Sequence, residues 1–163
     1  MGSGTRTQSK GFNCMSIDID HILLEISSLP EYNEQLSLQI SPQGASAEGR
    51  FNNLSASEKD FNLFAYDLPY TNSIISSLGM YRTRLMKMTE KTCYTYHWDP
   101  SKRMHIPLIT NPGCLMVIDN VAKHMPADGS VWVTNNTKYH NAFNGGEENR
   151  IHLVACVLDY KFN

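Results

Sequence analysis

The sequence predicts a mainly β fold, a double-stranded β-helix (jelly-roll) with one or two N-terminal helices packed outside it. From residue 80 onward, short runs of strand-forming residues alternate with turn residues, a pattern typical of a sandwich or barrel. Before residue 80, apolar residues recur at helical spacing in two short stretches. Charged residues make up only 18 % of the chain, and Ser, Thr and Asn, which favour turns and short strands, take their place.

The N-terminal part contains the expected helices. Residues 19–26 carry apolar side chains at helical spacing, and Asp18 before them is a suitable N-cap. Residues 35–40 alternate between polar and apolar side chains and predict a strand. Residues 72–78 predict a second short helix, because Gly79 follows in the position that commonly ends helices.

The part of the chain after residue 80 consists of predicted strands separated by turns. Turn signals such as Asp128-Gly129 and Asn144-Gly145-Gly146 separate the runs from one another. The predicted strands cover residues 81–88, 92–98, 103–109, 114–118, 130–134 and 150–158.

The length of 163 residues suits one domain. We expect residues 1–11 to form a flexible tail and residues 12–163 a single jelly-roll domain, with its motifs in residues 80–158. The net charge of −2 without a basic stripe argues against nucleic acid as a partner. No apolar run is long enough for a membrane span, and no secretory signal is present.

The cysteines favour a reducing compartment. Cys14, Cys93, Cys114 and Cys156 are widely spaced and form no CxxC pair. Without an export signal, this spacing predicts free thiols rather than disulfides. The sequence therefore predicts a cytoplasmic protein.

His97 and Asp99 form the first candidate for a chemical site. In an extended chain, side chains two residues apart point to the same side, so this imidazole and this carboxylate can bind one ion. Taken alone, the pattern is more typical of a histidine paired with a surface aspartate.

His140 strengthens the prediction of a metal site, because a later strand of a closed barrel can return beside an earlier one. Together, His97, Asp99 and His140 supply two imidazoles and one carboxylate to one side of a metal. This set leaves the opposite side open and suits non-haem Fe(II). Zinc accepts the same ligands, so the identity of the metal stays open at this point.

Two further strands carry polar side chains that predict a cavity. Arg150, His152 and Val154 share one face of a strand, and a buried guanidinium requires an anion such as a ligand carboxylate. Arg103 and His105 share a face of another strand, opposite an apolar face. The alternatives are an arginine at a strand edge and an exposed polar face.

The motifs His97-Trp-Asp99, Arg103-Met-His105, His140 and Arg150, in this order, resemble the iron(II)/2-oxoglutarate-dependent oxygenases. Within them, the chain is most similar to the aspartyl/asparaginyl β-hydroxylase branch, which includes bacterial hydroxylases of free proline. The resemblance covers residues 80–158 and implies Fe(II) on the two histidines and Asp99. It also implies 2-oxoglutarate as co-substrate, with its far carboxylate on Arg150 and with Arg103 or His105 assisting.

One departure concerns Asp99, where the animal aspartyl hydroxylases carry Gly and lack this ligand; in this respect the chain is similar to the proline hydroxylases. The resemblance implies a dioxygenase that uses molecular oxygen, with ascorbate as a possible assisting reductant. It would hydroxylate an unactivated C–H of an amino acid or peptidyl side chain (Asp, Asn or Pro-like). The alternatives are a non-catalytic jelly-roll binding module with a structural metal and a zinc hydrolase.

The prime substrate stays open between a free amino acid and a peptide side chain. Arg82 and Arg84 share a face of the predicted strand 81–88. They are either an anchor for a substrate carboxylate or ordinary surface residues.

Overall fold

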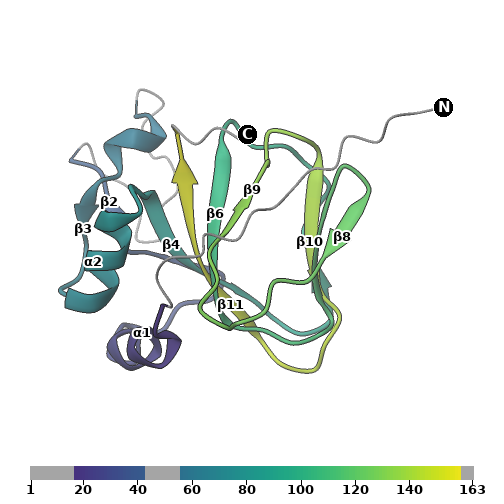
Figure 1. Cartoon of the computed structure of the whole chain (residues 1–163), viewed down its shortest axis with the longest axis horizontal. Helices are drawn as coiled ribbons and strands as arrows, with labels where there is room; N and C mark the ends of the chain where they lie inside the picture. Colours follow the sequence, from purple (N-terminus) through teal and green to yellow (C-terminus); the bar gives the residue numbers. More distant parts are fainter. Residues whose placement is uncertain (1–16, 43–55, 159–163) are drawn as a thin grey trace.

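A computed structural model describes residues 17–42 and 56–158 of the chain. Two helices cover one side of a five-stranded sheet, and a four-stranded sheet lies on its other side (Figure 1). This arrangement confirms the predicted mainly β jelly-roll with outer helices. The predicted tail, residues 1–11, lies outside the described residues.

The first helix, α1 (Ile19–Ile26), has the predicted bounds. The side chain of Asp18 accepts the backbone N–H of His21 at 3.0 Å and caps the helix start, as the sequence predicts. A short 3-10 helix, η1 (Glu58–Asp60), follows later in the chain.

The second helix, α2 (Pro69–Ser77), begins three residues before the predicted range of 72–78. Proline is suited to the first position of a helix because its φ is already helical and its missing N–H needs no partner. The carboxylate of Glu25 in α1 accepts the N–H groups of Tyr70 and Thr71, each at 2.8 Å, and so ties the two helices together. Gly79, with φ of +60°, follows the end of α2 as predicted.

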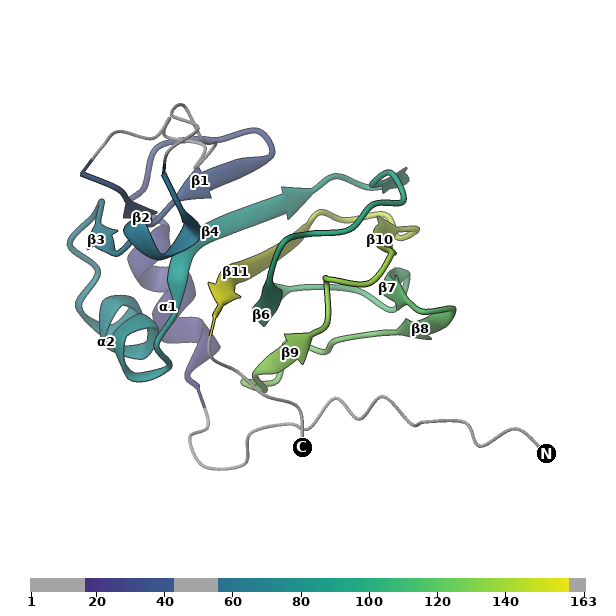
Figure 2. The same ribbon diagram turned by 90° about the horizontal axis from the view of Figure 1, so that it is seen from above.

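The larger sheet has the antiparallel order β1-β4-β11-β6-β9, and the smaller one β5-β10-β7-β8. Figure 2 shows β11, the last of the described strands in chain order, between β4 and β6. The strands of the larger sheet are β1 (Gln35–Ser37), β4 (Tyr81–Met88), β11 (Arg150–Val157), β6 (Lys102–Ile109) and β9 (Trp132–Thr134). Those of the smaller sheet are β5 (Thr92–Cys93), β10 (His140–Asn144), β7 (Cys114–Ile118) and β8 (Val121–Lys123), and β2 (Gln39–Ile40) pairs separately with β3 (Leu63–Phe64).

Two predicted strands are wrong in extent. The expected strand 35–40 is divided into β1 and β2, because at Leu38 the N–H bonds to Thr83 in β4 while the C=O bonds to Ala65, which follows β3. The expected strand 92–98 ends at Cys93, since the chain beyond it follows β10 only through separate contacts. The short strands β3, β8 and β10 were not predicted.

The hydrophobic core lies between the helices and the larger sheet. Its most completely buried side chains come from both helices and from the central strands, and they include Ile22, Ile75, Leu85, Ile106 and Leu153. The sequence neighbours of these strand residues point to the other face of the sheet, so that face is free to carry polar groups.

The described cysteines Cys93, Cys114 and Cys156 are free thiols, as the sequence predicts, and Cys14 lies outside the described residues. In the described part of the chain, no helix has the length and apolar character needed to cross a membrane.

Candidate metal centre and co-substrate pocket

A cavity of about 220 Å³ lies between the polar face of the larger sheet and the smaller sheet. Strands β4, β6 and β11 supply one wall, and β7 and β10 contribute to the other. All six site residues predicted from the sequence line this cavity: His97, Asp99, His140, Arg103, His105 and Arg150.

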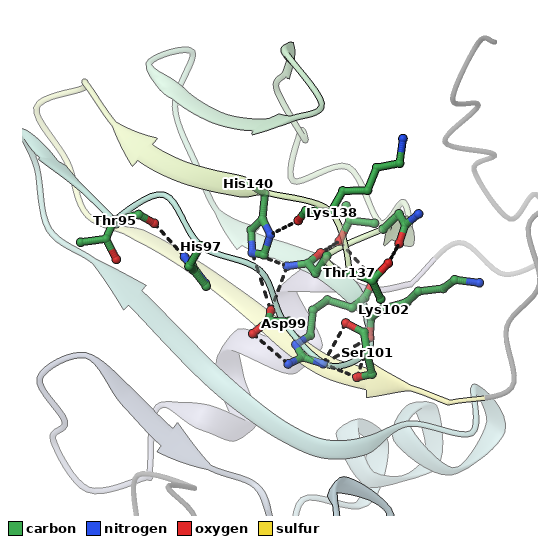
Figure 3. Close-up of polar contacts among 12 residues, drawn as sticks. Thr95, His97, Asp99, Ser101, Lys102, Thr137, Lys138 and His140 are labelled. Carbon is green, nitrogen blue, oxygen red and sulfur yellow. Dashed lines mark hydrogen bonds and ion pairs between the residues drawn. The ribbon is translucent and has the colours of Figure 1, made fainter.

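His97 and His140 are fixed to each other through the backbone. The N–H of His97 donates to the C=O of His140 at 3.0 Å, and the reverse bond measures 2.8 Å. One ligand atom from each of His97, Asp99 and His140 lies within 4.8 Å of the other two. Figure 3 shows Asp99 and His140 facing one another, with His97 on the same stretch of chain as Asp99.

Both imidazoles carry their proton on the nitrogen that points away from this cluster. Nδ1 of His97 bonds to the Thr95 carbonyl at 2.7 Å, and Nδ1 of His140 bonds to the Lys138 carbonyl at 2.9 Å (Figure 3). Because a carbonyl can only accept, each Nδ1 must donate, and in the neutral ring Nε2 then keeps its lone pair. The two Nε2 atoms are therefore suited to bind a metal.

Burial lowers the pKa of His140, and the neighbouring His97 lowers it further, although the Lys138 carbonyl acts in the opposite direction. A lowered pKa keeps the imidazole neutral near pH 7. Neutral imidazole is the form that ligates a metal.

The carboxylate of Asp99 presents one oxygen to the histidines. Oδ2 lies 3.6 Å from Nε2 of His140, whereas Oδ1 lies 3.2 Å from Nη2 of Arg103. His97 and Asp99 lie on the same side of the chain, as the sequence predicts. The alternation of side chains along a strand does not explain this placement. The N–H of Asp99 bonds to the Asn136 carbonyl at 2.8 Å, and this contact orients the residue outside any strand.

Asn136 is a site residue that the sequence did not reveal. Its buried amide donates to Oδ2 of Asp99 at 3.2 Å and to Nε2 of His140 at 2.9 Å. A metal ion at Nε2 would replace the second bond, since that nitrogen has a single lone pair. In the sequence, Asn136 belongs to an Asn-rich link without a motif.

The side of the cavity formed by β11 and β6 carries polar groups without anionic partners. Arg150 is buried and donates to the ring of His152, whose Nδ1 lies 2.7 Å from Nη2. None of the described carboxylates forms an ion pair with Arg150. His105 is buried as well, and both of its ring nitrogens lack a hydrogen-bond partner. Unpartnered buried polar atoms are costly, so this wall is suited to a polar ligand.

His105 and His152 are uncharged at neutral pH. Burial lowers the pKa of each well below the ordinary value, and the cationic Arg150 lowers both further. His152 lies behind Arg150 and does not line the cavity, whereas His105 does.

Arg84 is a second buried guanidinium in the cavity wall and is not a surface residue. It is 7 % exposed, Nη1 donates to Gln35 at 2.9 Å, and Nε has no partner. Burial lowers its pKa to about 10, which still leaves the group protonated near pH 7. Arg82 also lines the cavity and forms an ion pair with Glu58 at 3.3 Å.

Arg103 differs from Arg84 and Arg150 because its guanidinium already contacts carboxylates. Nη2 lies 3.1 Å from Oε1 of Glu58 and 3.2 Å from Oδ1 of Asp99. Burial alone would raise the pKa of Glu58, but Arg103, hydrogen bonds from Ser101 and Cys156, and Arg82 together outweigh burial and hold that pKa below its ordinary value. No motif marks Glu58 in the sequence, and it pairs with Arg103 only through the tertiary fold.

The sequence profile of the family described as Aspartyl/Asparaginyl beta-hydroxylase matches residues 19–159. The chain belongs to this family. Membership confirms the resemblance found in the sequence, and with it the prediction that the chain is an oxidoreductase of the hydroxylase class. It offers no support for the alternative of a binding module.

A solved structure shows the same fold. It is described as "Crystal structure of Oxidoreductase, 2OG-Fe(II) oxygenase family, from Burkholderia pseudomallei", and it superposes with a TM-score of 0.60 at 17 % identity. The match covers 85 % of this chain and 76 % of that one. At this identity the likeness shows the fold alone. Among curated proteins, none matches the chain.

Proposed function

We propose that this chain is an iron(II)- and 2-oxoglutarate-dependent dioxygenase that hydroxylates an unactivated C–H of an amino acid or peptidyl side chain. One observation carries the proposal. The cluster of His97, Asp99 and His140 opens into the same cavity as two buried groups without anionic partners, Arg150 and His105. A metal and an anionic co-substrate would satisfy both sets of groups together.

The donor set fits Fe(II). Two imidazoles and one carboxylate oxygen on one side of a metal leave the remaining positions open for co-substrate and oxygen. When bound, iron with 2-oxoglutarate and oxygen supplies the oxidising chemistry, which converts the co-substrate to succinate and CO2 and hydroxylates the substrate. The chain's own residues supply orientation and a water-poor cavity.

Arg150 is the proposed partner of the far carboxylate of 2-oxoglutarate. Its fork can donate two parallel hydrogen bonds to a carboxylate, and its contact with His152 fixes the orientation of the guanidinium. The unpartnered ring of His105 can donate a further hydrogen bond to the same ligand. Direct assistance from Arg103 stays a prediction, because Glu58 and Asp99 already engage its Nη2.

Arg84 is the proposed anchor for the prime substrate. Its protonated guanidinium lines the cavity with a free Nε, so it is suited to a carboxylate. Free amino acids and acidic peptide side chains both carry this group, and a panel of both types of substrate separates them.

We further infer that residues 12–163 act as one catalytic domain in the cytoplasm. The free thiols Cys93, Cys114 and Cys156 support a reducing compartment.

The test is turnover of 2-oxoglutarate by the purified chain with Fe(II), oxygen and ascorbate. We expect slow succinate formation without a prime substrate and none in the matched variant His140→Ala. Anaerobic addition of 2-oxoglutarate to the iron form should produce a metal-to-ligand charge-transfer band. If neither succinate nor this band appears, the proposed function is wrong.

A further inference from the structure

We propose that Glu58 is a positioning residue of the metal centre, which acts by holding Arg103 in the place from which Arg103 orients Asp99. The inference rests on the proposed function, because it assigns Asp99 as a metal ligand. It gives a role at the site to a residue from the N-terminal part of the chain, where the sequence shows no motif.

Glu58 is buried among groups that bind its carboxylate on both oxygens. Oε1 lies 3.1 Å from Nη2 of Arg103 and 3.3 Å from Nη1 of Arg82, and Oε2 accepts the hydroxyl of Ser101. The side chain of Glu58 is 8 % exposed. A charge in such a position is stable only when it is paired and hydrogen-bonded, so its contacts fix its place.

Arg103 is held from several directions. Its Nη2 is shared between Oε1 of Glu58 and Oδ1 of Asp99, while Nη1 donates to the carbonyl of Ser101 at 3.2 Å and to its hydroxyl. Only 4 % of its side chain is exposed. The guanidinium is therefore a fixed bridge between the two carboxylates.

This bridge determines which oxygen of Asp99 faces the histidines. Oδ1 is directed to Arg103, and Oδ2 is left beside Nε2 of His140 at 3.6 Å. An arginine fork prefers to bind both oxygens of one carboxylate. Glu58 competes for the guanidinium, and without it Arg103 can take both oxygens of Asp99 and withdraw Oδ2 from the metal position.

The experiment measures binding of Co(II) to the full chain in the absence of 2-oxoglutarate. In Glu58→Gln, which keeps the shape of the side chain and removes its charge, we expect Co(II) affinity to fall by about tenfold to a hundredfold. The visible absorption of bound Co(II) should also change, because the position of the Asp99 carboxylate alters the ligand set.

The matched control is Glu25→Gln. Glu25 also binds several donors, at the start of α2, but it does not line the cavity. This variant should lose thermal stability and keep the Co(II) affinity and spectrum of the parent. If Glu58→Gln behaves in the same way, Glu58 is a structural residue and the proposal is wrong.

Two further variants test the route through Arg103. In an Arg103→Met background, Glu58→Gln should cause almost no additional loss of Co(II) affinity, and additive losses would overturn the proposal. If Glu58→Gln does not fold, Ser101→Ala replaces it, since it removes the hydroxyl that donates to Glu58 and accepts from Arg103. It should lose about twofold to tenfold in affinity, and no loss would contradict the inference.

The outcome for the parent separates this inference from the proposed function. If the parent protein binds Co(II) with no higher affinity than the His97→Ala variant does, both the proposed function and the role of Glu58 are wrong. A parent that binds Co(II) through His97, while Glu58→Gln retains full affinity, overturns only the role of Glu58.

Discussion

The two faces of the larger sheet carry opposite kinds of side chain on the same strands. Toward the helices, β4, β6 and β11 present Leu85, Ile106 and Leu153, which are almost completely buried. Toward the cavity, β4 and β11 present Arg84 and Arg150, which are nearly as buried. Burial of the apolar face stabilises the fold without any ligand. Burial of the polar face is costly, so that face is complete only when a ligand supplies the missing charge.

The largest expected effect comes from removing a metal ligand on the cavity side. His97→Ala or His140→Ala should abolish iron binding and turnover, because each removes one of the paired Nε2 donors and leaves the core face untouched. Circular dichroism should show a folded chain, and metal analysis should show no bound iron. Full turnover in either variant would exclude the proposed ligand set. Asp99→Ala should cause a large loss with some residual activity.

The next effect concerns the co-substrate. Arg150→Ala should weaken 2-oxoglutarate binding by about 2–5 kcal/mol, since it leaves a buried carboxylate without its charged partner. This corresponds to about thirtyfold to several thousandfold in Kd. Arg150→Lys should lose less, because it keeps the charge without the planar fork. The charge-transfer band, followed during an anaerobic titration, measures the Kd.

Iron affinity serves as the control for the Arg150 variants, since Arg150 is not among the clustered ligands. An Arg150→Ala protein that binds 2-oxoglutarate like the parent would show that this arginine has a structural role only.

A substitution on the apolar face should lower the stability of the fold and leave the binding of 2-oxoglutarate unchanged. Ile106 is completely buried in the core, and Ile106→Val should lower the free energy of unfolding by about 0.5–1.5 kcal/mol. The Kd for 2-oxoglutarate should stay that of the parent, because the neighbouring His105 keeps its place in the cavity wall. Urea unfolding and the same titration measure the two quantities. A changed Kd would mean that the two faces are coupled.

The smallest effect is a dependence of stability on pH that comes from the polar face. The pKa of His152 in the folded chain lies well below the ordinary value for histidine, first through burial and then through Arg150. The unfolded chain therefore takes up a proton near pH 6.5 that the folded chain does not bind. This contribution to stability is complete above that pH and is lost as the pH falls below it.

The test compares urea unfolding of the parent and of His152→Gln at about pH 7.5 and about pH 5.5. The variant should lose less stability between the two values, because glutamine does not titrate. An equal loss in both proteins would assign the pH dependence to other groups.

The sequence predicts well the features that depend on local periodicity. The helix 19–26 and the two-faced strands β6 and β11 follow from spacing and alternation alone. It predicts poorly what depends on contacts between distant segments. The expected strand 92–98 ends early because β10, which has no clear strand pattern, determines where His97 lies.

The same limit applies to the site. His97, Asp99, His140 and Arg150 stand in recognisable motifs, and the fold places them around one cavity. Glu58 and Asn136 stand in no recognisable motif. Glu58 contacts Arg103, and Asn136 contacts Asp99, only after the chain has folded back across more than one element.

The central place of β11 has a consequence for synthesis of the protein. This strand lies between β4 and β6 and carries Arg150, yet it comes after all the other strands that the structure describes. During translation, β4 and β6 therefore emerge from the ribosome with unpaired edges, and the larger sheet can close only after residue 157 has been added. Such late, long-range pairing is slow and leaves strand edges open to aggregation. Chaperone supply during expression should therefore limit the yield of active protein more than the stability of the finished fold does.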